Sequence, residues 1–165
     1  MIGFDINQER IEMMQNEIDP SQELDSSDFV NTDITFTYES KELLKAHFHV
    51  ISVPTDVDNN KIPDLRPLCQ ASQDVGRALK KGDYVVYEST VYPGCTEEEC
   101  IPILELYSNL QAGEDFKVAY SPERISPGDK TKTIKDILKI VAAIDSEALT
   151  EVSDVYKHII DAGIY

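Results

Sequence analysis

The chain has 165 residues, 41% of them hydrophobic, which is enough for one core of ordinary size. Its 15 basic and 31 acidic residues give a formal net charge of −16. Such a surface repels nucleic-acid phosphates and anionic lipids, so we expect neither a nucleic acid nor a membrane as a partner. The sequence has no apolar run long enough to cross a bilayer and no secretion signal, which predicts a cytoplasmic location.

Short apolar runs alternate with helical patterns along the whole chain. This alternation is typical of parallel βαβ units, so the predicted fold class is α/β, with a doubly wound and mainly parallel sheet. The helices are expected to fill the gaps between the strands. The strands themselves are predicted at residues 1–6, 33–37, 48–53, 83–88, 116–120 and 137–142.

The opening residues MIGFDINQER have the pattern of the second strand of a dinucleotide-binding unit. Apolar residues around Gly3 lead into Asp5, and Asn7 is placed to cap a helix. An acid at the carboxyl end of such a strand can accept hydrogen bonds from both hydroxyls of an adenosine ribose. Arg10, one helical turn further on, can help to hold the adenosine end. An ordinary acid at a strand–helix junction explains the same residues equally well.

Two helices can be predicted from their patterns. The helix after Asp64 has one buried stripe, which predicts that Cys69 lies in the core. The stripe consists of Leu65, Leu68, Cys69, Ser72, Val75 and Leu79. The next helix begins with the capping-box pattern Thr96-Glu97-Glu98-Glu99, and Pro102 is expected to kink this helix or to shift its start.

Cysteine and histidine give little support for a metal or disulfide site. Cys69, Cys95 and Cys100 form no C-x-x-C pair, so neither a disulfide scaffold nor a zinc finger is supported. His47 and His49 lie two residues apart and such a pair can bind a metal, but no third ligand is evident nearby. We therefore predict no metal site.

Three predicted strands end in polar loops that contain proline. These loops are SVPTDVDNNKIPDL (52–65), ESTVYPGC (88–95) and YSPERISPGDK (120–130). Ser89 and Thr90 offer hydroxyl groups, and Glu123 and Arg124 stand between two prolines. Ligands of open α/β sheets bind along the carboxyl edge of the strands. Three such loops on one edge therefore predict a binding site.

The same strings, taken together, resemble a known family. GFDIN, PTDVD, PDL, YESTVYPG and SPERISPGDK occur in order over essentially the whole chain. They look like the N-terminal NAD-binding domain of the UDP-glucose/GDP-mannose dehydrogenase family, and most of all like its UDP-N-acetylhexosamine 6-dehydrogenase branch. The resemblance implies a Rossmann-like fold and NAD-dependent oxidation of the C6 alcohol of a UDP-sugar. The sugar would be UDP-N-acetylhexosamine or UDP-glucose, oxidised to a uronic acid for surface polysaccharides.

The resemblance also implies roles for the matching residues. The residues expected to bind the cofactor are Asp5, Arg10, Val53, Pro54, Thr55, Ser89, Thr90 and Glu123. The charge of Asp5 favours NAD over NADP, because it would repel a ribose 2′-phosphate. Thr90 and Glu123 are implied to be catalytic, the first by positioning a water and the second by acid–base chemistry when a thioester is hydrolysed. Glu123 and Arg124 are implied to approach the UDP-sugar.

Two parts of such an enzyme are not found in the sequence. The first strand, with the glycine-rich turn that cradles the pyrophosphate, would precede Met1. The linking helix and the UDP-sugar domain would follow Tyr165, and no cysteine here has the Gly-Gly-x-Cys-Phe-Pro neighbours of the family's nucleophile. We therefore expect residues 1–165 to be an incomplete NAD-binding domain, inactive alone, from an enzyme that forms a homodimer when full length.

This expectation has a structural consequence and two alternatives. In the strand order 3-2-1-4-5-6, the absent strand separates the strand at 1–6 from the strand at 48–53, and both would keep an unpaired edge. One alternative is a non-catalytic remnant that serves as an interaction module. Another is a Rossmann-like hydrolase that uses Glu123 and Cys95, whose pKa a helix start can lower.

Overall fold

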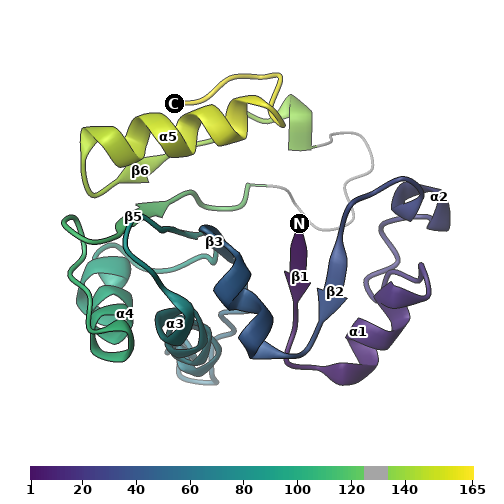
Figure 1. Ribbon diagram of the computed structural model, residues 1–165, viewed down its shortest axis with the longest axis horizontal. Helices are drawn as coiled ribbons and strands as arrows, with labels where there is room; N and C mark the ends of the chain where they lie inside the picture. Colours follow the sequence, from purple (N-terminus) through teal and green to yellow (C-terminus); the bar gives the residue numbers. More distant parts are fainter. Residues whose placement is uncertain (125–133) are drawn as a thin grey trace. The chain divides into compact units, whose positions relative to one another are not determined.

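The structure is a computed structural model that describes residues 1–124 and 134–165. The chain divides into two compact units, Met1–Ala46 and His47–Tyr165, and each is described by itself (Figure 1). Within the described ranges, none of the helices is both long and apolar enough to cross a membrane.

The first unit is built around two parallel strands. Its elements are β1 (Ile2–Phe4), α1 (Gln8–Gln15), α2 (Ser26–Phe29), β2 (Thr35–Thr37) and the 3-10 helix Ser40–Lys45. Gly3 lies opposite Phe36 in the register, and a Cβ atom at Gly3 would come within 2.7 Å of the Phe36 ring. The glycine therefore lets the ring lie against β1. Asn7 caps α1 as predicted, because its side chain accepts a hydrogen bond from the Arg10 N–H at 3.2 Å.

The second unit contains a four-stranded sheet with the order β3-β4-β5-β6. Its strands are β3 (Phe48–Ile51), β4 (Tyr84–Tyr87), β5 (Lys117–Tyr120) and β6 (Ala142–Ala143). The first three are parallel, and the last pairs antiparallel with β5. Ile51, Tyr87 and Tyr120 are partners across the parallel ladder. The loops that follow β3, β4 and β5 therefore begin at the same edge of the sheet.

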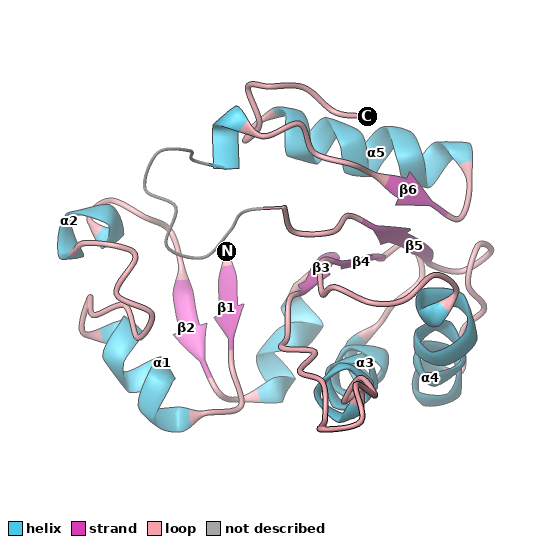
Figure 2. Cartoon of the chain, turned by 180° about the vertical axis from the view of Figure 1, so that it is seen from behind, coloured by secondary structure: helices cyan, strands magenta, loops and turns pink. Residues whose placement is uncertain are grey.

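Helices cover both faces of this sheet (Figure 1; Figure 2). They are α3 (Arg66–Ala78), α4 (Ile101–Ser108) and α5 (Ser146–Lys157). Val85 and Tyr87 of β4 belong to one buried cluster with residues of α3 and α4, whereas Val86 belongs to a second cluster with residues of α5. Neighbouring residues of a strand point to opposite faces, so β4 is apolar on both. The predicted α/β fold with a mainly parallel sheet is confirmed.

Each predicted strand range overlaps a strand, but the last range is wrong in extent. Residues 137–142 were expected to form a strand, whereas the strand covers only Ala142–Ala143. The backbone of Lys139 is instead hydrogen-bonded to Gly163 and Tyr165 near the C-terminus. This pairing takes Lys139 out of the main sheet.

Two further predictions about helices need correction. The predicted capping box at Thr96 is absent. Thr96 is instead the buried first residue of a wide helical turn, the single π-helical turn Thr96–Cys100, which has no side-chain cap. Pro102 lies in the first turn of α4, directly after this wide turn, where its missing N–H interrupts no α-helical hydrogen bond. Cys69 is only partly buried and was wrongly expected in the core, although α3 itself is found as predicted.

Candidate cofactor and substrate site

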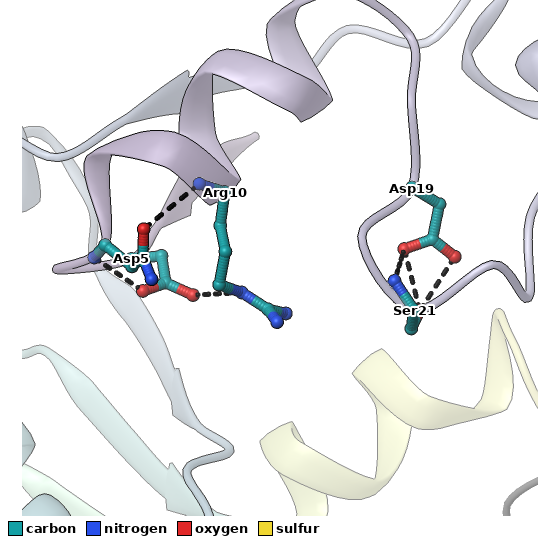
Figure 3. Close-up of polar contacts among 5 residues, drawn as sticks. Asp5, Arg10, Asp19 and Ser21 are labelled. Carbon is teal, nitrogen blue, oxygen red and sulfur yellow. Dashed lines mark hydrogen bonds and ion pairs between the residues drawn. The ribbon is translucent and has the colours of Figure 1, made fainter.

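In the first unit, Asp5 lies directly beyond the carboxyl end of β1. Its N–H donates to the Thr37 carbonyl at 3.3 Å and so continues the ladder between β1 and β2. Its carboxylate accepts the Asn7 N–H at 2.8 Å and Arg10 Nε at 3.1 Å (Figure 3). The structure therefore brings together Asp5 and Arg10, the two residues predicted to hold the ribose.

The Asp5–Arg10 pair has the chemistry that a ribose diol requires. An ionised carboxylate offers about four acceptor positions, and each oxygen of Asp5 takes one of the bonds described above. Positions thus remain for hydroxyl donors. The side chains of Asp5 and Arg10 are 31% and 48% exposed, so the pair adds little stability but orients the carboxylate.

A second carboxylate of this unit organises the loop after α1. Asp19 accepts hydrogen bonds from the Ser21 N–H and hydroxyl (Figure 3) and from the N–H groups of Glu23 and Leu24. Partial burial acts to raise the pKa of Asp19, but these hydrogen bonds outweigh it and lower the pKa to about 2. Asp19 is not among the residues predicted to bind a ligand.

In the second unit, the segments that follow β3 and β4 are hydrogen-bonded to each other. The buried Ser89 hydroxyl accepts the Val53 N–H at 2.9 Å and donates to the Val53 carbonyl at 2.8 Å. Two residues further on, Thr55 Oγ1 donates to the Thr90 carbonyl at 2.7 Å. The predicted residues Val53, Thr55, Ser89 and Thr90 thus lie side by side, with Pro54 among them. The Ser89 hydroxyl serves to position the backbone, whereas Thr90 is exposed.

The segment after β5 runs beside the end of β4. The Ser121 N–H donates to the Tyr87 carbonyl at 2.9 Å, and the Glu123 N–H donates to the Glu88 carbonyl at 3.3 Å. The Glu123 carboxylate accepts the Arg124 N–H at 2.6 Å, and both side chains are exposed. Glu123 is therefore at the same edge as Ser89 and Thr90. The remainder of the string SPERISPGDK, from residue 125, lies outside the described residues.

Sequence reasoning missed three residues beside Glu123. Lys139, only 3% exposed, donates from Nζ to Glu88 Oε1 at 2.9 Å, and the Tyr156 hydroxyl donates to the same oxygen at 2.6 Å. Burial, and then this donation to Glu88, raise the pKa of Tyr156. Burying an ammonium group without a partner costs on the order of several kcal/mol, because the group loses its hydration. An ion pair with a carboxylate has to offset this cost. A lysine within the apolar run ILKIVA was the available signal, since lysine is rarely buried without a partner.

The cysteines near this edge do not have the environment of a nucleophile. Cys95 and Cys100 are fully buried in the core beside α3 and α4. Burial raises the pKa of the Cys95 thiol, and it raises the pKa of Cys100 to about 12. The expectation that a helix start lowers the pKa of Cys95 is therefore wrong, and the hydrolase alternative loses its nucleophile.

The histidine pair lies at the opposite end of the strands. His47 Nδ1 is 2.8 Å from Oδ1 of the buried Asp83, and Lys80 Nζ is 3.2 Å from Oδ2. The buried His49 Nε2 is 3.7 Å from Asp83 Oδ2, too far for a hydrogen bond. In the ranges 1–124 and 134–165, no three His, Cys, Asp or Glu side chains are grouped so as to hold a metal ion.

Comparison with known proteins assigns these features to a family. The model of the UDP-glucose/GDP-mannose dehydrogenase family, NAD binding domain, matches residues 1–160. Protein CapL of Staphylococcus aureus is 48% identical over 165 residues, and the UDP-N-acetyl-D-glucosamine 6-dehydrogenase of Pseudomonas aeruginosa is 45% identical over 166 residues. All of this chain is covered in both alignments, but it spans only 39% of the length of each relative.

The fold is also similar to that of a solved structure. The crystal structure of the NDP-N-acetyl-D-galactosaminuronic acid dehydrogenase from Methanosarcina mazei Go1 superposes with a TM-score of 0.90 and 29% identity. The match covers 99% of this chain and 37% of that chain. The expected Rossmann-like fold is thereby confirmed, and NAD is the cofactor for which the matching domain of the family is named. The chain belongs to the UDP-glucose/GDP-mannose dehydrogenase family and corresponds to its NAD-binding domain.

Proposed function

We propose that this chain is part of the cofactor domain of an NAD-dependent UDP-sugar 6-dehydrogenase. The proposed enzyme oxidises the C6 alcohol of UDP-N-acetylhexosamine or UDP-glucose to the uronic acid, a precursor of surface polysaccharides. The observation that carries this proposal is the Asp5–Arg10 pair at the carboxyl end of β1, in a chain that matches an NAD-binding domain. The name of the Pseudomonas aeruginosa relative supports the choice of substrate class.

In this proposal the residues of each unit have separate tasks. Asp5 accepts the ribose hydroxyls and its charge selects NAD, while Arg10 holds the carboxylate in place. In the second unit, the segment Val53–Thr55, fastened by Ser89 and Thr90, lines the cofactor site. When bound, NAD supplies the acceptor for the hydride that leaves C6.

The exposed groups at the sheet edge would act on the sugar nucleotide. Glu123 has an exposed carboxylate, which can take a proton from a water molecule, and the neighbouring Thr90 offers a hydroxyl to orient that water. Arg124 carries a positive charge that suits a nucleoside diphosphate. Because Cys95 and Cys100 are buried, and burial raises the pKa of all three thiols, Cys69 included, we assign the nucleophile of the thioester step to polypeptide outside these 165 residues.

We also propose that a further strand completes the sheet. Among the described residues, β1 pairs only with β2, and β3 pairs only with β4. In the family's strand order, a first strand followed by the glycine-rich turn pairs with the strand that ends in the ribose-binding acid, which here is β1. This proposal agrees with the share of the relatives, 39%, that the chain spans. It implies that the 165-residue chain does not turn over substrate alone.

Calorimetric titration tests the proposed function. NAD+ and UDP-N-acetylglucosamine are titrated separately into the 165-residue chain and into the longer enzyme that contains it. We expect weak NAD+ binding to the short chain, and formation of NADH when the long enzyme receives NAD+ and the UDP-sugar together. A long enzyme that binds NAD+ but oxidises no UDP-sugar contradicts the substrate, and one that does not bind NAD+ contradicts the whole proposal.

One observation favours a second function, that of an interaction module. The edges of β1 and β3 that remain unpaired among the described residues can receive a strand from another polypeptide. Light scattering on the short chain distinguishes the two functions. Stable self-association without NAD+ binding supports the module, whereas a monomer that binds NAD+ supports the cofactor domain.

A further inference from the structure

A buried ammonium group lies between two carboxylates at the edge of the sheet that carries the proposed catalytic residues. Lys139 Nζ is 2.9 Å from Glu88 Oε1 and 3.8 Å from Glu123 Oε2. The Lys139 side chain is 3% exposed, whereas that of Glu123 is 39% exposed. The lysine is thus hydrogen-bonded to the inner carboxylate, and its charge also acts on the outer one.

The surrounding structure holds Lys139 in one place. Its backbone N–H donates to the Gly163 carbonyl at 3.1 Å, and its carbonyl accepts the Tyr165 N–H at 2.8 Å. Its Nζ lies 5.1 Å from the centre of the Tyr156 ring, and the Tyr156 hydroxyl donates to Glu88 Oε1, the oxygen that Lys139 also contacts. The ammonium therefore has a fixed position, although the carboxylate of Glu123 is exposed.

The network joins the segments that carry the proposed site. Glu88 directly precedes Ser89 and Thr90, and its carbonyl accepts the Glu123 N–H. A fixed positive charge beside Glu123 limits the directions in which this exposed carboxylate can point. Such restriction matters in a reaction, because a displacement of about 1 Å of a reacting group can cost about 100-fold in rate.

We propose that Lys139 is a positioning residue that holds the Glu123 carboxylate at the reacting edge, and that Glu88 and Tyr156 fix Lys139. The inference rests on the proposed function, because the role of Glu123 in the reaction is part of that proposal. It adds Lys139, Glu88 and Tyr156 to the residues on which turnover depends. None of the three needs to touch the substrate.

Lys117, the first residue of β5, provides a matched control. Its Nζ also lies between two carboxylates, at 2.7 Å from Asp145 and 3.0 Å from Glu147. It begins β5, however, so it is at the amino end of the strand, away from Glu123. Lys117→Met removes a similar ion pair without changing the proposed site.

The test measures kcat and KM in the full-length enzyme proposed above, with thermal unfolding of each variant as a check on folding. We expect Lys139→Met to lower kcat about 100-fold while KM for NAD+ stays within about threefold. Lys139→Arg should restore most of kcat, because it keeps the charge. Lys117→Met should leave kcat unchanged. The 13C signal of the Glu123 carboxyl should move in Lys139→Met and not in Lys117→Met.

A wild-type kcat in Lys139→Met, or a loss that Lys139→Arg does not restore in a folded protein, overturns the inference. If Lys139→Met does not fold, Tyr156→Phe replaces it, since this variant removes only the hydroxyl that donates to Glu88. A several-fold lower kcat in Tyr156→Phe supports the inference, and an unchanged kcat overturns it. An inactive wild-type enzyme contradicts the proposed function. An active wild-type enzyme whose Lys139 variants keep the wild-type kcat contradicts this inference alone.

Discussion

The hydroxyl of Ser89 occupies both backbone hydrogen-bonding groups of Val53, at 2.9 Å from its nitrogen and 2.8 Å from its oxygen. Ser89→Ala would leave both groups without this partner at a partly buried position. We expect the free energy of unfolding to fall by about 1–3 kcal/mol, the typical effect of unsatisfied buried polar groups. Urea denaturation of the 165-residue chain measures the change.

The neighbouring Ser52 supplies the control for this substitution. Ser52 is exposed and adjoins Val53 in the sequence, so Ser52→Ala should change stability by less than about 0.5 kcal/mol. If Ser89→Ala lowers the free energy of unfolding no more than Ser52→Ala does, the Ser89 hydroxyl does not stabilise the contact between the segments after β3 and β4.

Asp5 should determine which dinucleotide the chain prefers. Asp5→Asn removes the charge and one of the acceptor groups, so we expect the affinity for NAD+ to fall about tenfold and the preference over NADP+ to shrink. Calorimetry with both dinucleotides measures the two effects. Glu9→Gln makes the same change of charge in the first turn of α1 and should alter neither. An unchanged ratio of affinities in Asp5→Asn would contradict the assigned role.

The strands and the site loops were predictable because the signals for them are local. Val85 and Val86 stand in a short apolar run, and Ser89 and Thr90 follow it directly, so one stretch of sequence marks both a strand and its loop. The pairing of Ser89 with Val53 was not predictable. It joins residues 36 positions apart, and only the fold brings them together.

The errors arose where a local pattern competes with a distant contact. Lys139 stands in an apolar run that favours a strand, but its partners Glu88 and Tyr156 come from elsewhere in the chain and draw it into a buried ion pair. Thr96 matches a capping box, yet Cys95 before it is already in the helical conformation and Thr96 is buried. In both cases tertiary structure overrides a pattern that is correct locally.

His49 should make stability depend on pH in the mildly acidic range. Burial lowers its pKa below the ordinary value of 6.5, although the charge of Asp83 acts in the opposite direction; Lys80 and His47 also face it. In the unfolded chain the His49 imidazole therefore becomes protonated near pH 6.5, whereas in the folded chain it stays neutral at that pH. The free energy of unfolding should consequently decrease as the pH falls below about 6.5.

Replacing the imidazole tests this origin of the pH dependence. His49→Leu cannot titrate, so its stability should change less than that of the wild type in urea denaturation between pH 7 and 5. The Asp83 carboxyl contributes only at lower pH. Its burial acts to raise the pKa, but hydrogen bonds from Lys80 and His47 keep the value below 3.8. Equal slopes in the two proteins would exclude His49 as the cause.

Asp19 should stabilise the loop after α1 through its charge. Its pKa of about 2 lies below the ordinary 3.8, so its contribution is complete above pH 4 and disappears as the pH falls through 2. At pH 7, Asp19→Asn should cost less than about 1 kcal/mol, because water screens a partly exposed carboxylate. The amides of Ser21, Glu23 and Leu24, which donate to this carboxylate, should exchange hydrogen up to about fivefold faster. Asp33→Asn changes another exposed acid of the same unit and should leave the exchange rates of these amides unchanged. Equal exchange rates in the two variants would show that the Asp19 charge does not stabilise the loop.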